Sequence, residues 1–202
     1  MARVFWRRAQ RNRTFVGGDI RNYTNMDKGN ELPKRKPTRL KNFDYNAIGG
    51  YFITLCTEDR RQILSRIVGV DVGMTCGHSG DPKNTELLPY GIVADKYIKQ
   101  MSDFYENITV EQYVIMPNHI HLLLFVCDDG SPRTSTPTKQ TSTVSHFVST
   151  FKRFCNKEYG RNIWQRGFHD HIIRGREDYD EIAKYISENP MRWHYDELYS
   201  EK

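Results

Sequence analysis

Long apolar runs are missing from this 202-residue sequence. The longest, Leu122 to Cys127, is far shorter than the roughly 20 residues that a helix needs to cross a bilayer. The first residues, MARVFWRRAQRNR, contain no apolar stretch that could form the core of a signal peptide. We therefore expect a soluble, cytosolic protein with no membrane partner.

Paired cysteines are also missing. Cys56, Cys76, Cys127 and Cys155 lie far apart, and no two of them form a C-x-x-C pair. Neither a zinc knuckle nor a disulfide framework is indicated, which weakens the interpretation as a structural zinc protein. We expect buried thiols or thiols in loops. The sequence has no internal repeats.

Acidic residues are scarce in the first 42 residues, which hold 12 Lys/Arg against 3 Asp/Glu, a net charge of +9. The remaining 160 residues hold 18 basic and 22 acidic side chains, a net charge of −4. Residues 1–42 are therefore predicted to be a flexible basic arm, ending in PKRKPTRLK, and residues 43–202 the folded domain. The arm suits a phosphate backbone, but a solvated tail that aids solubility explains the charge equally well.

The order of the predicted elements indicates the fold. Residues 50–57 (GYFITLCT) are rich in β-branched and aromatic side chains, which is typical of a strand. Periodicity predicts the other elements: helices over 89–105, 144–155 and 178–189, strands over 108–116, 119–126 and 168–174, and loops over 66–88 and 128–143. This order predicts an α+β protein with a ferredoxin-like split βαβ arrangement, one antiparallel sheet with helices packed on it, plus the basic N-terminal arm.

Two histidines stand two residues apart in the predicted strand 119–126. Because side chains alternate faces along a strand, His119 and His121 project the same way. Two neighbouring imidazoles can form half of a metal site. A hydrogen-bonded pair of histidines within a sheet is the commoner explanation of a bare H-x-H pattern.

The last predicted helix carries a tyrosine that its apolar stripe does not explain. At 100° per residue, Tyr185 and Asn189 fall together on the flank of the stripe formed by Tyr179, Ile182 and Ile186. A tyrosine and an amide on one helix edge could face the two histidines. A flank tyrosine that only packs over the sheet is a common alternative.

Four motifs in a fixed order add a resemblance to a known family. They are RKPTRLKNFDYN…GYFITLCT, ITVEQYVIMPNHIHLLL, WQRGFHDHIIR and IAKYISENPMRW. From about Arg35 to Trp193, the sequence resembles the single-tyrosine HUH-endonuclease transposases of insertion sequences, and within them the REP-associated tyrosine transposases.

The resemblance implies a function and a set of site residues. It implies metal-dependent cleavage and rejoining of single-stranded DNA near hairpins of repetitive palindromic elements, through a covalent 5′-phosphotyrosine. Tyr185 matches the family's nucleophile, and His119, His121 and Asn189 match its ligands for Mg²⁺ or Mn²⁺. It further implies a monomer or homodimer in the bacterial cytoplasm, associated with the nucleoid when bound to DNA.

Basic side chains elsewhere are candidates for contacts to DNA. They are Lys34, Arg35, Lys36 and Arg39 in the arm, and Arg153, Lys157, Arg166, His171 and Arg174 in the domain. Two other functions stay open: a single-stranded nucleic-acid binder of ferredoxin-like fold that does not cut, and a HUH replication or conjugation initiator. A non-cutting binder has no need for the tyrosine, the amide and the histidine pair together, whereas the initiators differ in the order and number of these motifs.

Overall fold

A four-stranded antiparallel sheet forms the centre of the domain. The computed structural model describes residues 46–68, 85–128 and 142–199. The strands of the sheet lie in the order β4-β5-β1-β6. They are β1 (Gly49–Cys56), β4 (Ile108–Ile115), β5 (His119–Val126) and β6 (His169–Ile172), and the helices are α2 (Pro89–Phe104), α3 (Thr143–Tyr159) and α4 (Arg176–Glu188). Short 3₁₀ helices η1 (Glu58–Arg60) and η3 (Pro190–Tyr195) follow β1 and α4.

The connections give the sheet its split βαβ topology. Helix α2 connects β1 to β4, and β5 is inserted between these two strands. Helix α3 connects β5 to β6, and β1 is inserted between them. This order confirms the ferredoxin-like α+β fold expected from the sequence, with one antiparallel sheet and helices packed on it.

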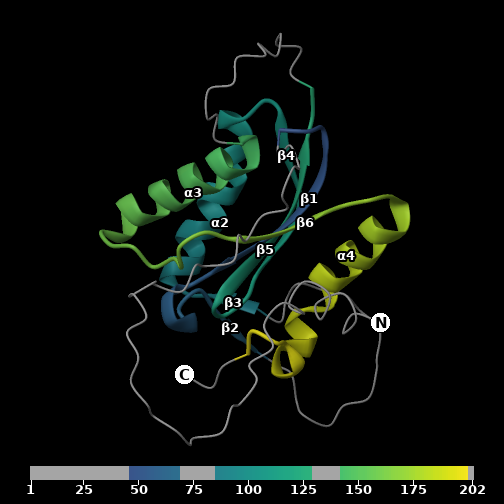
Figure 1. Ribbon diagram of the computed structural model, residues 1–202. Coiled ribbons are helices and arrows are strands. Elements are labelled where there is room, and N and C mark those ends of the chain that lie inside the picture. Colours follow the sequence, from purple (N-terminus) through teal and green to yellow (C-terminus); the bar gives the residue numbers. More distant parts are fainter. Residues whose placement is uncertain (1–45, 69–84, 129–141, 200–202) are drawn as a thin grey trace, which may run out of the picture. The chain divides into compact units, whose positions relative to one another are not determined.

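The two faces of the sheet are covered by different helices. Helices α2 and α3 cover one face, and α4 lies on the other side of the sheet (Figure 1). Every second side chain of β5 packs into the core beneath α2 and α3; these are Ile120, Leu122, Leu124 and Val126. The helices contribute the other half of this core with Ala94, Ile98, Met101, Val144, Phe147, Val148, Phe151 and Cys155. The other β5 set, which begins with His119 and His121, therefore faces the α4 side.

Truncation of a core leucine should destabilise the fold far more than truncation of an exposed isoleucine. Leu124 is fully buried, whereas Ile92 on α2 is 57% exposed. Leu124→Ala should lower the free energy of unfolding by about 2–5 kcal/mol, and Ile92→Ala should change it by less than about 0.5 kcal/mol. Urea unfolding of the two variants measures the difference, and equal stabilities would contradict the placement of β5 in the core.

The ends of the segment 66–88, which we expected to be a flexible connection, carry regular structure. Strands β2 (Ser65–Ile67) and β3 (Thr85–Leu87) pair as a two-stranded antiparallel sheet, so that expectation is wrong at both ends. Three residues are too few to show a periodicity, and tertiary contacts decide their conformation. Gly91 permits one such contact, because a Cβ there would lie 1.9 Å from the carbonyl oxygen of Leu64. Residues 69–84 lie outside the described part of the chain.

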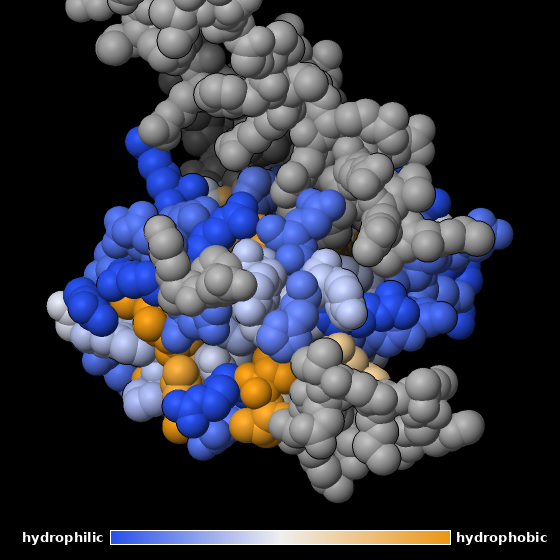
Figure 2. Space-filling model, turned by 90° about the horizontal axis from the view of Figure 1, so that it is seen from below, coloured by the Kyte–Doolittle hydropathy of each residue, from blue (hydrophilic) through white to orange (hydrophobic). Residues whose placement is uncertain are grey.

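The other expected elements lie within a few residues of the observed ones. Helix α4 begins two residues earlier than expected, and β6 is shorter than the expected strand 168–174. The expected arm and most of the expected loop 128–143 lie outside the described residues. None of the helices described is long and apolar enough to cross a membrane. Seen from below, the described surface is mostly hydrophilic, with small hydrophobic patches (Figure 2).

Candidate active site

The site is built around the two histidines at the start of β5. His119 and His121 are fully buried, and their Nε2 atoms lie 3.0 Å apart. Both project from the same face of the strand, as the sequence predicted. On the neighbouring strand β1, the ring of Phe52 stacks on His121, with ring centroids 5.0 Å apart. The two histidines are therefore enclosed between the sheet, helix α4 and the segment after α4.

Hydrogen bonds to the outer ring nitrogens orient both imidazoles. His119 Nδ1 lies 2.8 Å from the side-chain oxygen of Asn118, whose own amide donates to the Leu198 carbonyl at 2.7 Å. His119 Nδ1 therefore carries the proton, and its Nε2 presents a lone pair. His121 Nδ1 lies 2.9 Å from the hydroxyl of Thr54, which can donate or accept. When Thr54 accepts, both Nε2 atoms, which lie 3.0 Å apart, carry a lone pair that can bind a cation.

Burial keeps both imidazoles neutral. It lowers the pKa of His119 to about 3, and the nearby charge of Arg60 adds to this effect. Burial also lowers the pKa of His121 well below the ordinary value; His119 adds to this decrease and Asp196 opposes it. Because neutral imidazole is the form that binds a metal ion, protons do not compete for the pair near neutral pH.

Helix α4 places Tyr185 over the pair. The Tyr185 hydroxyl lies 3.4 Å from His121 Nε2 and donates to Asp196 Oδ2 at 3.2 Å. The tyrosine ring meets Phe52 edge to face, with centroids 6.0 Å apart. Gln112 on β4 holds this helix against the sheet through a 2.8 Å hydrogen bond to Ser187 Oγ. The flank position expected for Tyr185 thus brings its hydroxyl to the histidines.

Asn189 follows α4 directly and is 2% exposed. Its amide nitrogen donates to Asp196 Oδ2 at 3.1 Å. Its side-chain oxygen is buried and has no hydrogen-bond partner among the described residues. A buried amide oxygen without a partner costs free energy, on the order of 1–3 kcal/mol, unless something else binds it. This oxygen therefore has the free lone pairs that a metal ligand needs.

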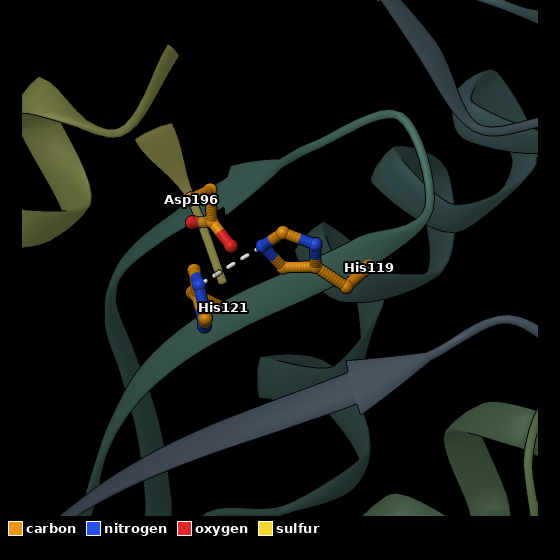
Figure 3. Close-up of side chains that lie close together, drawn as sticks. All are labelled: His119, His121 and Asp196. Atoms are coloured by element: carbon orange, nitrogen blue, oxygen red, sulfur yellow. Dashed lines mark hydrogen bonds between the residues drawn. The ribbon is translucent and has the colours of Figure 1, made fainter. Parts of the chain in front are cut away.

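Asp196 connects the nucleophile candidate to the histidines. Its carboxylate faces the two imidazoles (Figure 3). One ligand atom from each of His119, His121 and Asp196 lies within 4.8 Å of the others, close enough for one metal ion. Asp196 Oδ2 accepts hydrogen bonds from Tyr185 and Asn189, and Oδ1 accepts from the Leu198 backbone at 2.6 Å. The carboxylate of Asp196 thus orients both the Tyr185 hydroxyl and the Asn189 amide.

The segment 190–199 forms a wall of the site. The ring centroid of Trp193 lies 5.9 Å from that of His119, and Trp193 is buried. Leu198 is buried as well, and its carbonyl accepts the Asn118 amide. Four parts of the chain therefore build one site: the β5 histidines, β1, helix α4 and the segment after it.

The sequence of this region matches a known family. Residues 49–189, from the first residue of β1 to Asn189, match the family described as transposase IS200-like. The chain belongs to this family. The match confirms the transposase family that the four motifs indicated and gives the chain a transposase-type role in cutting DNA.

The transposase is similar to two further proteins. A protein of Haemophilus influenzae, itself uncharacterised, is 27% identical over 180 residues, which cover 82% of this chain and 93% of the relative. A solved REP-associated tyrosine transposase bound to a REP hairpin is 18% identical, with a TM-score of 0.51 over 76% of this chain and 74% of that chain. At this identity, the structural likeness shows the shared fold.

The structure brings only some of the predicted residues of the transposase together. His119, His121, Tyr185 and Asn189 meet in one site. Arg153 and Lys157 are exposed on α3, across the sheet from the histidines, and Arg166 and Arg174 are exposed beside β6. His171 pairs with Phe52 on the histidine face, and its Nε2 lies 3.0 Å from Asp178. Lys34, Arg35, Lys36 and Arg39 lie outside the described residues. All these DNA contacts stay predictions.

Sequence reasoning missed three polar residues of the site: Asp196, Thr54 and Asn118. Asp196 follows helix α4 in a segment without periodicity, so no pattern indicated its orientation. Thr54 belongs to a strand that we recognised, but its partner His121 is 67 residues away. Asn118 directly precedes His119, and this adjacency was the one available signal.

Proposed function

We propose that this transposase cuts and rejoins single-stranded DNA through a covalent 5′-phosphotyrosine at Tyr185. The supporting observation is the meeting of Tyr185 with His121 at 3.4 Å, two residues 64 positions apart in the sequence. A half-buried tyrosine that only packed on the sheet would have no need of a carboxylate and a histidine at its hydroxyl. Tyr185 and His121 belong to the same chain, which supports a site that one chain completes.

The chemistry follows from the groups at the hydroxyl. Tyr185 Oη attacks the phosphorus, a bond forms between them, and the bond from phosphorus to the 3′-oxygen breaks. The tyrosine proton has its first acceptor in Asp196 Oδ2, to which the hydroxyl already donates. In net terms, this proton moves to the departing 3′-oxygen. Attack by a 3′-hydroxyl on the phosphotyrosine reverses the step and rejoins a strand.

The residues of the site fit a divalent cation. His119 and His121 would hold it through Nε2 and Asn189 through its side-chain oxygen, with Asp196 near enough to act as a further ligand. Such a mixed nitrogen and oxygen set suits Mn²⁺, and Mg²⁺ is the alternative. When bound, the cation would offset the negative charge of the phosphate oxygens. The unpartnered oxygen of Asn189 supports this assignment.

Hairpin DNA is the proposed partner. The solved transposase of the same fold is bound to a REP hairpin, and the motifs of this chain resemble those of its group. We therefore propose that the chain binds a hairpin and cuts the single strand beside it.

A labelled hairpin oligonucleotide with a single-stranded flank tests the function. We expect the full chain with Mn²⁺ to form a protein–DNA adduct that survives a denaturing gel, and to form none when the metal is chelated. Binding without an adduct would instead favour a non-cutting single-strand binder. An adduct that forms equally well under chelation would contradict the metal assignment.

The arm should supply much of the attraction to DNA that does not depend on sequence, because it carries +9 against −4 for the remainder. Deletion of residues 1–41 should weaken binding and flatten its dependence on salt. If Lys34, Arg35, Lys36 and Arg39 each contact one phosphate, the slope of log K against log salt should become shallower by about 3. Titrations at several salt concentrations measure this slope. An unchanged slope would assign the attraction to the folded domain.

A further inference from the structure

The turn after β1 is fastened beside the histidine site. The backbone nitrogen of Thr57 donates to the Asn118 carbonyl at 2.9 Å, and the Thr57 hydroxyl lies 2.8 Å from the Arg61 carbonyl and 3.0 Å from the Asn118 carbonyl. Leu64 donates to the Pro117 carbonyl at 3.0 Å. Both ends of the turn are therefore held against the two residues that lead into His119, and η1 lies between these ends.

Two residues of this turn have a costly backbone conformation. Asp59 and Arg60 have φ angles of 55° and 54°, the left-handed region that residues with a side chain seldom adopt. Each costs roughly 1 kcal/mol, and such strain persists where neighbouring contacts hold it, often at functional sites. Here the contacts of Thr57 and Leu64 hold it. Arg60, one of these two residues, extends its guanidinium to the segment after α4.

The guanidinium of Arg60 lies against the wall of the site. The Arg60 Nη1 donates to the Glu197 carbonyl at 3.3 Å. Glu197 follows Asp196, whose carboxylate accepts the hydrogen bond from the Tyr185 hydroxyl. Arg60 is half-buried. Its positive charge also reaches His119, whose pKa is lowered mainly by burial and further by this charge. Arg60 is thus a cation beside the segment that carries Asp196, the acceptor for Tyr185, and near enough to His119 for its charge to act there.

A positive side chain at this position would add to the charge that the proposed metal ion supplies. The side chains around the Tyr185 hydroxyl are two neutral imidazoles, an amide and a carboxylate, which together bring no positive charge to an incoming phosphate. A phosphodiester carries one negative charge, and more accumulates on its non-bridging oxygens as the tyrosine oxygen approaches. A guanidinium can donate two parallel hydrogen bonds to two such oxygens.

We propose that Arg60 binds the non-bridging oxygens of the phosphate that Tyr185 attacks and stabilises the charge that develops there. The inference rests on the proposed function. The bonds made and broken are those between phosphorus and the tyrosine and 3′-oxygens; Arg60 stays protonated and gives up no proton. The hydrogen bond to Glu197 would be exchanged for bonds to the phosphate.

Substitution of Arg60, with the next residue as matched control, tests the proposal in the full chain. Arg61 is half-buried like Arg60, but its side chain is 40% exposed and its guanidinium lies 3.8 Å from the Glu58 carboxylate. Arg60→Gln should form the adduct at least 100-fold more slowly, the usual loss for one donor to a developing oxyanion. The rate of adduct formation by Arg60→Lys should lie between those of Arg60→Gln and the wild type. Arg61→Gln should form the adduct at a rate within about two-fold of the wild type, because water screens the charge of Arg61. Hairpin affinity and thermal midpoint should stay near the wild-type values in all three.

A substrate with one methylphosphonate at the cleaved position separates charge stabilisation from a structural tie to Glu197. The methyl group removes the charged oxygen, so Arg60→Gln and the wild type should react within about five-fold of each other on this substrate. An equal slowing on both substrates, or a methylphosphonate that neither protein cuts, overturns the proposal. So does an Arg60→Gln rate near that of the wild type on ordinary DNA. If the wild type itself forms no adduct on ordinary DNA, the proposed function fails, independently of Arg60.

Discussion

Tyr185→Phe should abolish the covalent adduct with DNA. Phenylalanine keeps the ring that meets Phe52 and removes the oxygen that would bond to phosphorus. The hydrogen bond lost to Asp196 should cost only about 0.5–1.5 kcal/mol of stability, so fold and hairpin binding should persist. Adduct yield on a denaturing gel, beside a binding titration of the same protein, measures the two effects separately.

Tyr195 provides the matched control for this substitution. It lies in η3, close to Asp196 in the sequence, but its side chain is 80% exposed. Tyr195→Phe should leave adduct formation unchanged, and mass spectrometry of the wild-type adduct should place the DNA on the peptide that contains Tyr185. An adduct on Tyr195 or Tyr199, or cutting by Tyr185→Phe, would refute the assignment of the nucleophile.

Loss of either histidine of the pair should abolish metal-dependent cutting. His119→Ala and His121→Ala each remove one of two nitrogens that lie 3.0 Å apart, and a cation that loses such a ligand is bound much more weakly. Because phosphate contacts elsewhere dominate affinity for DNA, hairpin binding should stay within a few-fold of the wild type. Calorimetric titration with Mn²⁺ and adduct yield measure the two losses.

The buried position of these histidines requires controls. An alanine leaves a cavity, so His121→Asn, which retains a polar side chain, should be measured for metal binding and thermal midpoint as well. His194 is an exposed histidine of η3, and His194→Ala should behave as the wild type. Asn189→Ala should weaken metal binding less than the histidine substitutions do, and high Mn²⁺ should partly restore cutting. Full activity of both histidine variants in Mg²⁺ would contradict a metal site at this pair.

Local sequence pattern was sufficient for most of the fold. The alternation along β5 and the helical spacing of α2, α3 and α4 reflect burial of one side of each element, and such a pattern lies within 8 to 17 consecutive residues. The strands β2 and β3 escaped prediction because three residues cannot display a period. Their pairing depends on residues about 20 positions apart.

In the candidate site, too, the sequence predicted relations within one element and missed contacts between elements. The sequence by itself determined that His119 and His121 share a strand face, and that Tyr185 and Asn189 share a helix edge, because both follow from the geometry of a single element. Only the tertiary structure decided that these two pairs meet. It also decided that Asp196 bridges Tyr185 and Asn189 and that Thr54 holds His121. The physical reason is that these contacts join side chains on different elements, and their distances follow from how the sheet, α4 and segment 190–199 pack.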